Sequence, residues 1–196
     1  MTAGIVLNGE IPHNIECDFL VCADGGYDYL AEQGIVPNIL IGDMDSIKSK
    51  VNIDIKKYPC EKNETDGELA LNYLIDKGFK DIVIYGAFGG RPDHEFGNYC
   101  LMYKAFLQGI KVSCRSDKYT AYITDKPFNL KKTKNKTVSL VPFIDWIHIN
   151  SCKGLKYPMD NLTISKASTI GISNIALEDE IFIDIESGAA LIFVIE

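Results

Sequence analysis

Residues 18–26, Asp-Phe-Leu-Val-Cys-Ala-Asp-Gly-Gly, decide the fold class. The run from Phe19 to Ala23 is short, continuous and apolar, as expected of a strand buried on both faces of a sheet. It ends in the polar turn 24–26, and residues 27–33 then have the composition of a helix that Gly34 terminates. A buried strand, a glycine turn and a helix in direct succession predict one βα unit of an α/β sheet.

The alternation of strands and helices continues towards residue 125 and predicts a mostly parallel sheet with helices on both faces. Thr65 is a suitable N-cap for a helix that begins at Asp66, because its hydroxyl can accept a hydrogen bond from a free amide of the first turn. The further strands are expected at 38–42, at 81–86 and from Lys111, and the helices from 66 to Gly78 and from about 93 to 108.

The pattern changes after residue 125. Residues 126–137, KPFNLKKTKNKT, are polar and basic, and we expect a linker or an exposed loop there. Beyond them apolar and polar residues alternate with period two, and Ser187-Gly188 between the last two runs predicts a hairpin. We therefore expect two domains, 1–125 and 126–196. The second is a small antiparallel β-sandwich, and its thin core favours packing against a partner surface.

Composition excludes several classes of protein. The 196 residues carry a formal net charge of −7, which disfavours nucleic acid and anionic membranes as main partners. The six cysteines show neither a C-x-x-C pair nor zinc-ligand spacing, so we expect reduced cysteines that serve as small packing residues. No signal-peptide pattern and no long apolar run is present, so we expect a cytoplasmic protein.

Four polar clusters lie where strands end or helices begin, which is where open α/β sheets bind ligands. Glycines let backbone amides approach phosphate, and carboxylates spaced D-x-D can share one hard cation such as Mg²⁺. Each cluster alone is also compatible with an ordinary turn, but four together indicate a metal–nucleotide site. Neither a G-x-x-x-x-G-K-[ST] loop nor a G-x-G-x-x-G fingerprint is present. The clusters span residues 23–26 (ADGG), 42–46 (GDMDS), 62–66 (KNETD) and 86–94 (GAFGGRPDH).

In this order, the motifs resemble those of thiamine pyrophosphokinases. The match comprises ADGG, P-x-x-x-I-G-D-x-D-S, K-x-x-T-D and G-G-R-x-D-H-x-x-x-N, the last spanning residues 89–98. In the second half, the segments 139–143, 154–158 and 171–174 resemble that family's thiamine-binding sandwich. The resemblance implies an α/β fold, with an N-terminal Rossmann-like ATP-binding domain followed by a thiamine-binding β-sandwich. It also implies a homodimer with active sites shared between subunits.

The resemblance further implies roles for individual residues. The expected reaction transfers the diphosphate of ATP to the hydroxyethyl oxygen of thiamine, giving thiamine diphosphate and AMP. Asp43, Asp45 and Asp66 would hold Mg²⁺ and, with Arg91, would be catalytic. Ser173, Asn174 and Tyr157 would contact thiamine, although Tyr157 could equally be a core aromatic. The ATP site would be formed by Asp24, Gly25, Gly26, Lys62, Thr65, Gly89, Gly90, Arg91, Asp93, His94 and Asn98.

Two positions depart from the family pattern, and two other functions compete with it. Asn63 stands where the family often has Asp, which puts a metal role there in doubt, and Met44 replaces a common Phe. A haloacid-dehalogenase-like phosphatase would explain the D-x-D after a strand, but Gly42 interrupts the apolar run before it. A non-catalytic nucleotide sensor would not require three carboxylates around a metal.

Overall fold

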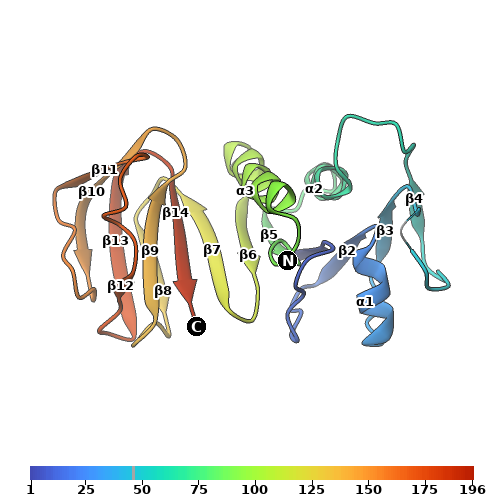
Figure 1. Ribbon diagram of the computed structural model, residues 1–196, viewed down its shortest axis with the longest axis horizontal. Helices are drawn as coiled ribbons and strands as arrows, with labels where there is room; N and C mark the ends of the chain where they lie inside the picture. Colours follow the sequence, from blue (N-terminus) through green and yellow to red (C-terminus); the bar gives the residue numbers. More distant parts are fainter. Residues whose placement is uncertain (46) are drawn as a thin grey trace. The chain divides into compact units, whose positions relative to one another are not determined.

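The protein, described here by a computed structural model for residues 1–45 and 47–196, divides into two compact units. The first spans Met1–Asp117 and the second Lys118–Glu196 (Figure 1). The first unit has a parallel sheet with helices, and the second has antiparallel strands. This succession of an α/β unit and an antiparallel β unit confirms the predicted fold class.

The sheet of the first unit has six parallel strands in the order β6-β5-β1-β2-β3-β4. Its central strand β1 was not predicted, because it is only four residues long and begins at the third residue of the chain. β1 is paired on both sides, with β2 and with β5. The strands are β1 (Ala3–Val6), β2 (Phe19–Ala23), β3 (Ile39–Gly42), β4 (Ile55–Lys57), β5 (Asp81–Tyr85) and β6 (Lys111–Arg115).

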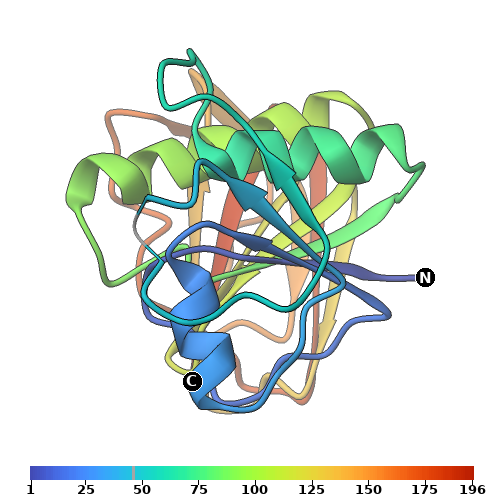
Figure 2. The same cartoon turned by 90° about the vertical axis from the view of Figure 1, so that its right-hand side faces the viewer.

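Helices cover both faces of this sheet, as predicted. Figures 1 and 2 show α1 on one side, with α2 and α3 on the other. Leu30 of α1 is fully buried in a cluster with Cys22, Leu40 and Tyr85 of the sheet. The helices are α1 (Gly26–Glu32), α2 (Asp66–Asp76) and α3 (Pro92–Leu107).

The order of the strands creates a switch point between β1 and β5. The chain runs outward from β1 through β4, returns on the other side of β1 as β5, and continues to β6. Connections that leave neighbouring strands in opposite directions open a crevice at the carboxyl ends of those strands. The loops after β1 and β5 stay hydrogen bonded to each other there, with the Gly9 amide 2.9 Å from the Gly86 oxygen. A Cβ on Gly86 would lie 2.4 Å from the Leu7 oxygen, so this approach requires glycine.

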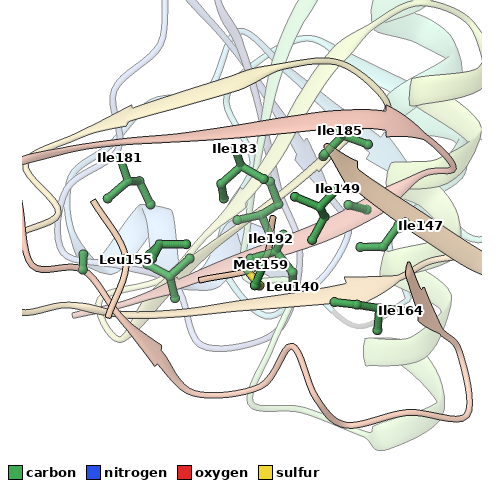
Figure 3. Close-up of a cluster of buried hydrophobic side chains, with 13 residues drawn as sticks. Leu140, Ile147, Ile149, Leu155, Met159, Ile164, Ile181, Ile183, Ile185 and Ile192 are labelled. Atoms are coloured by element: carbon green, nitrogen blue, oxygen red, sulfur yellow. The ribbon is translucent and has the colours of Figure 1, made fainter. Parts of the chain in front are cut away.

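The second unit is a sandwich of two four-stranded antiparallel sheets, ordered β12-β9-β14-β7 and β11-β10-β13-β8. Its core is rich in isoleucines, which point towards one another between the sheets in Figure 3. The strands are β7 (Tyr119–Thr124), β8 (Phe128–Lys131), β9 (Thr137–Pro142), β10 (Trp146–Lys153), β11 (Leu162–Ser165), β12 (Asn174–Ile175), β13 (Glu180–Ser187) and β14 (Ala190–Ile195).

The prediction of a loop over 126–137 was wrong for part of its length. Residues 128–131 form the edge strand β8, which pairs with β13. Phe128 and Leu130 pack against the sandwich core while Asn129 and Lys131 are exposed. The surrounding lysines make the segment as a whole polar, so its composition indicates a loop although residues 128–131 alternate like a strand.

The predicted hairpin through Ser187-Gly188 was also wrong. β13 pairs with β10 and β8, whereas β14 pairs with β7 and β9, so the chain passes here from one sheet to the other. Gly188 has φ +84°, and a Cβ on it would lie 2.2 Å from the Trp146 oxygen. A turn signal between two alternating runs cannot tell a hairpin from such a crossing, because the flanking strands have the same pattern in both cases.

The compact units divide before β7, earlier than the change of pattern at residue 125. β7 pairs antiparallel with β14 along its whole length, from Tyr119 opposite Ile195 to Thr124 opposite Ala190. The assignment of separate functions to 1–125 and 126–196 stays a prediction. Within residues 1–45 and 47–196, none of the helices combines the length and apolar character that crossing a membrane requires.

Candidate functional site

The first unit contains a hollow of about 1220 Å³ at the carboxyl edge of its sheet. It includes the loops after β1 and β5, so it occupies the switch point. Among the described residues, Gly26, Asp45 and Gly89 of the predicted ATP and metal site lie outside its lining. The predicted residues that do line it are Asp24, Gly25, Asp43, Lys62, Thr65, Asp66, Gly90, Arg91, Asp93, His94 and Asn98.

Gly42 brings three carboxylates together. It is the last residue of β3, with φ +152°, and precedes Asp43 directly. A Cβ on Gly42 would lie 3.0 Å from Cβ of Asp24 and 3.3 Å from Oδ1 of Asp66. Asp24 directly follows β2, with φ 34° and 9% of its surface exposed, and Asp66 begins α2. Two strand ends and one helix start therefore converge on this glycine.

Asp43 and Asp45 form the acidic pair that the D-x-D spacing predicts. The Asp45 amide donates to Oδ1 of Asp43 at 3.1 Å, and Met44 between them has φ 70°. The hydrogen bond from the Asp45 amide lowers the pKa of Asp43, while hydrogen bonding with Asp43 and its charge raise the pKa of Asp45. Two carboxylates this close are stabilised by a shared proton or by a cation. Ser46, the end of this motif, lies outside the described residues.

Cys60 extends this acidic pair, and sequence reasoning missed it. One donor atom each of Asp43, Asp45 and Cys60 lies within 4.8 Å of the others. A hydrogen bond to Asp43 and the negative charges of Asp43 and Asp45 raise the pKa of the Cys60 thiol. The cysteine is exposed, unlike Cys22 and Cys114, which are buried packing residues as expected. Nothing in its spacing along the chain could have placed it beside the D-x-D pair.

Lys62 and Thr65 organise the start of α2. The ammonium of Lys62 lies 2.5 Å from Oδ1 of Asp66, one helical turn along the chain. Both side chains are largely shielded, at 12% and 26% exposure. Oγ1 of Thr65 accepts from the Glu68 amide at 3.2 Å, which confirms the predicted N-cap. Asn63, the departure from the family pattern, is exposed.

In the glycine loop after β5, two backbone amides donate to a side chain of α3, the helix that follows the loop. Oε1 of Glu95 accepts from the Gly89 amide at 2.7 Å and from the Gly90 amide at 3.1 Å. These are amides that the glycine pattern assigns to phosphate. Arg91 forms a two-pronged ion pair with Asp93, with Nη2 2.6 Å from Oδ2, and this pair lowers the pKa of Asp93.

Asn98 and Lys104 add contacts from the body of α3. Nδ2 of Asn98 donates to the Ala87 oxygen at 2.8 Å and ties the glycine loop to the helix. Nζ of Lys104 lies 2.6 Å from Oε1 of Glu68 on α2. Sequence reasoning missed this ion pair, because two long side chains on separate helices carry no motif. It also missed Asn8, which follows the unpredicted β1. The lining residues outside the predicted clusters and site are Leu7, Asn8, Gly9, Cys60, Gly67, Glu68, Glu95, Gly97, Cys100, Leu101 and Lys104.

The second unit brings the three predicted thiamine residues near one another, because Asn174 of β12 follows Ser173 in the chain and contacts Tyr157. Tyr157 is 54% exposed, which excludes the alternative that it is a core aromatic. Asn174 is 4% exposed, and its side chain contacts the backbone of Tyr157. Ser173 is exposed and has φ 61°. An exposed aromatic beside an exposed hydroxyl is suited to a small planar ligand.

Comparisons with known proteins agree with this arrangement. The family description "Thiamin pyrophosphokinase, catalytic domain" matches residues 13–114, and "Thiamin pyrophosphokinase, vitamin B1 binding domain" matches residues 127–190. Thiamine pyrophosphokinase from Bacillus subtilis (strain 168) is 35% identical over 160 residues, which cover 77% of this chain and 75% of that protein. Thiamine pyrophosphokinase 1 from Oryza sativa subsp. japonica is 24% identical and covers 94% of this chain and 84% of its own length.

Solved structures show the same resemblance. The crystal structure of thiamine pyrophosphokinase from Bacillus subtilis superposes with a TM-score of 0.89 at 28% identity, covering 100% of this chain and 99% of that one. The crystal structure of thiamin pyrophosphokinase from Geobacillus thermodenitrificans superposes with a TM-score of 0.86 at 25% identity, covering 100% of this chain and 98% of that one. The yeast structure, at 19% identity and a TM-score of 0.81, shows the common fold alone.

Proposed function

The chain belongs to the thiamin pyrophosphokinase family, and on this basis we propose that it transfers the diphosphate of ATP to the hydroxyethyl oxygen of thiamine. The products are thiamine diphosphate and AMP. The observation that carries the proposal is the approach of Asp24, Asp43 and Asp66 around Gly42, in a hollow that also exposes Lys62 and Arg91. Carboxylates for a metal beside cations for phosphate are what phosphoryl-type transfer requires.

The donor set is suited to Mg²⁺. Asp43 and Asp45 offer carboxylate oxygens close enough to share one ion, and Asp66 adjoins them across Gly42. Hydrogen bonding with Asp43 and its negative charge raise the pKa of Asp45, and a cation bound between the two carboxylates would offset this repulsion. We assign Mg²⁺ to Asp43, Asp45 and Asp66. When bound, the ion neutralises charge on the phosphate oxygens of ATP.

The protein's own cations and amides would hold the phosphates. Lys62 points into the carboxylate cluster, and Arg91 stands at the start of α3 beside the glycine loop. For Arg91 to bind phosphate it must leave Asp93, which is feasible because the pair is exposed and such pairs contribute little stability. Likewise, the amides of Gly89 and Gly90 become available when Glu95 turns away.

The chemical step is a displacement at the β-phosphorus. The thiamine hydroxyl oxygen forms a bond to that phosphorus, and the bond from the β-phosphorus to the bridging oxygen of the α-phosphate breaks with AMP as the leaving group. The hydroxyl proton passes to a carboxylate of Asp66 or Asp43. Alignment of the reactants and neutralised charge would supply most of the rate enhancement, since little covalent chemistry falls to the protein.

Thiamine would be bound by the second unit of a partner chain in a homodimer. Ile170, Ile172 and Leu177 are 62%, 48% and 53% exposed and flank Ser173 and Asn174. Exposed apolar side chains around a predicted ligand site favour burial against a second protein surface. In such a dimer Tyr157 and Ser173 of one chain would face the nucleotide site of the other.

Thiamine-dependent formation of AMP tests the proposal. Incubation with ATP, Mg²⁺ and thiamine should give AMP and thiamine diphosphate in equal amounts, measured by chromatography. ADP with thiamine monophosphate would contradict the reaction type. Hydrolysis of small phosphate esters without thiamine would favour a phosphatase instead.

A further inference from the structure

Tyr157 lies in an irregular segment, yet its backbone is held at two atoms. The Tyr157 amide donates to Oδ1 of Asn174 at 3.0 Å, and Nδ2 of Asn174 donates to the Tyr157 oxygen at 2.7 Å. The same Oδ1 accepts from the Ile175 amide at 2.8 Å. An amide side chain has two acceptor positions and two donor hydrogens, so both acceptor positions and one donor of Asn174 are committed to backbone.

These contacts extend a short antiparallel ladder by one residue. Leu155 and Ala176 form an isolated bridge, with the Leu177 amide 2.8 Å from the Gly154 oxygen. The Lys156 amide donates to the Ile175 oxygen at 2.8 Å. Directly beyond this ladder, the side-chain amide of Asn174 bonds to both the amide and the oxygen of Tyr157.

The hydrogen bonds from the Asn174 side chain to the Tyr157 backbone form a clamp, and this clamp is itself anchored in the sandwich. Asn174 is 4% exposed, and its residue pairs with Val138 of β9. Next to it, the Ser173 amide donates at 2.9 Å to the hydroxyl of Ser139, which is 5% exposed. Ser173 has φ 61°, a left-handed conformation that a non-glycine residue adopts only with local support. Buried side chains on β9 and β12 therefore fix both exposed residues.

The ring that this clamp positions is suited to a cation. Nζ of Lys156 lies 5.3 Å from the centre of the Tyr157 ring, so the ring already attracts one positive charge. The thiazolium ring of thiamine carries a positive charge of the same kind. A ring with 54% exposure and a fixed backbone offers such a ligand a contact that needs little ordering on binding.

We infer that Asn174 and Ser139 are positioning residues, of which Asn174 fixes the peptide of Tyr157 and Ser139 fixes Ser173 for contact with thiamine. This rests on the proposed function, since it takes thiamine as the ligand of Tyr157. It assigns Asn174 to the backbone of Tyr157, in place of the direct thiamine contact that the family resemblance implies. Ser139 carried no predicted role.

Two measurements on the full-length protein test the inference. Hydrogen exchange reports on the Tyr157 amide directly, and calorimetry with thiamine reports on the consequence. In Asn174→Ala the Tyr157 amide should exchange at least tenfold faster, while amides of β13 keep their protection. The dissociation constant for thiamine should rise about five- to tenfold, the order of one misplaced aromatic contact, and that for ATP should not change.

Matched variants separate positioning from direct contact. Asn150→Ala removes an exposed asparagine of the same unit, whose Nδ2 donates to Asp184, and should leave both readouts unchanged. Tyr157→Ala should weaken thiamine binding, and adding Asn174→Ala to it should weaken it no further. If Asn174→Ala does not fold, Asn174→Asp and Ser139→Ala replace it. The aspartate sets a carboxylate oxygen against the Tyr157 oxygen, so it too should release the Tyr157 peptide and speed exchange of its amide.

Three results would overturn the inference. These are an unchanged exchange rate of the Tyr157 amide, wild-type thiamine affinity in a variant whose amide exchanges fast, and additive losses in the double variant. Additive losses would show that Asn174 acts on thiamine independently of Tyr157. Failure of the wild-type protein to bind thiamine would instead overturn the proposed function, and the exchange data would still decide whether the clamp exists.

Discussion

Gly42 governs how closely the acidic residues of the first unit approach one another. Gly42 has φ +152°, a backbone conformation that favours glycine, and Asp43 follows it just past the end of β3. The missing Cβ leaves room for Asp24 on one side and Asp66 on the other. Gly42, which interrupts the apolar run expected of a dehalogenase-like strand, is therefore required by the close approach of these side chains. It permits three carboxylates to converge beside the ammonium of Lys62, and a bound cation would offset the repulsion that remains.

Neutralising the metal carboxylates should abolish most of the turnover. Asp43→Asn, Asp45→Asn and Asp66→Asn each remove one negative charge from the cluster and should lower kcat at least tenfold, measured with saturating ATP and thiamine. Asp54→Asn, an exposed aspartate of the same unit, is the matched control. Asn63→Asp should also be tolerated. Near-wild-type turnover in all three variants, with an intact fold, would refute the metal assignment.

Glu95 occupies the glycine loop that we propose as a phosphate site. Its carboxylate holds the amides of Gly89 and Gly90, so ATP must displace it before those amides can bind phosphate. Glu95→Gln keeps the size but weakens the hydrogen bonds, because a neutral acceptor is weaker than a charged one. We expect ATP to bind about two- to fivefold more tightly, measured by calorimetry. Glu32→Gln on α1 is the control, and weaker binding in Glu95→Gln would mean that the carboxylate assists nucleotide binding.

At the level of elements, βα units were predictable because each is encoded locally. The apolar run 19–23 and the glycine turn after it predicted β2 and α1, and Thr65 predicted the start of α2. β1 was missed because it is short, and with it the loop of Asn8. The partners of β13 and β14 could not be inferred, because pairing depends on contacts distant in the sequence.

Thr65 connects the stability of an element to the site. Its hydroxyl caps α2, and the first residue of that helix is Asp66. Thr65→Ala should lower the free energy of unfolding by about 1 kcal/mol, measured in urea, because an amide of the first turn loses its partner. Turnover should fall as well, since Asp66 would be less firmly placed. Thr65→Ser retains the hydroxyl and should behave like the wild type. Equal stability of all three proteins would show that the cap contributes nothing.

For the whole molecule, the sequence predicted which residues form the site better than what they contact. Clusters after successive strands were expected at one sheet edge, and most of them line one hollow. Their partners were not predictable. Glu95 accepts from the amides of the glycine loop, Arg91 pairs with Asp93, and Asn174 holds Tyr157. Such contacts depend on side-chain geometry in three dimensions, which motif spacing does not encode.

Mixing two defective chains tests the proposed dimer. Asp43→Asn disables the nucleotide site, and a chain with Tyr157 and Ser173 both changed to alanine disables the thiamine site. Random pairing makes half of the molecules heterodimers, and each has one intact site of two, so about a quarter of wild-type activity should return. Recovery of no activity would mean that each chain binds both substrates by itself. A fully active monomer in light scattering would equally contradict the shared site.

The fate of labelled phosphate tests the central claim most directly, because it identifies the phosphorus that thiamine attacks. ATP carrying radioactive phosphorus at the β position is incubated with the protein, Mg²⁺ and thiamine, and the products are separated by chromatography. Attack at the β-phosphorus predicts that all transferred label is in thiamine diphosphate and that the AMP, which keeps only the α-phosphate, is unlabelled. Label that stays in ADP, beside an unlabelled thiamine monophosphate, would contradict diphosphate transfer.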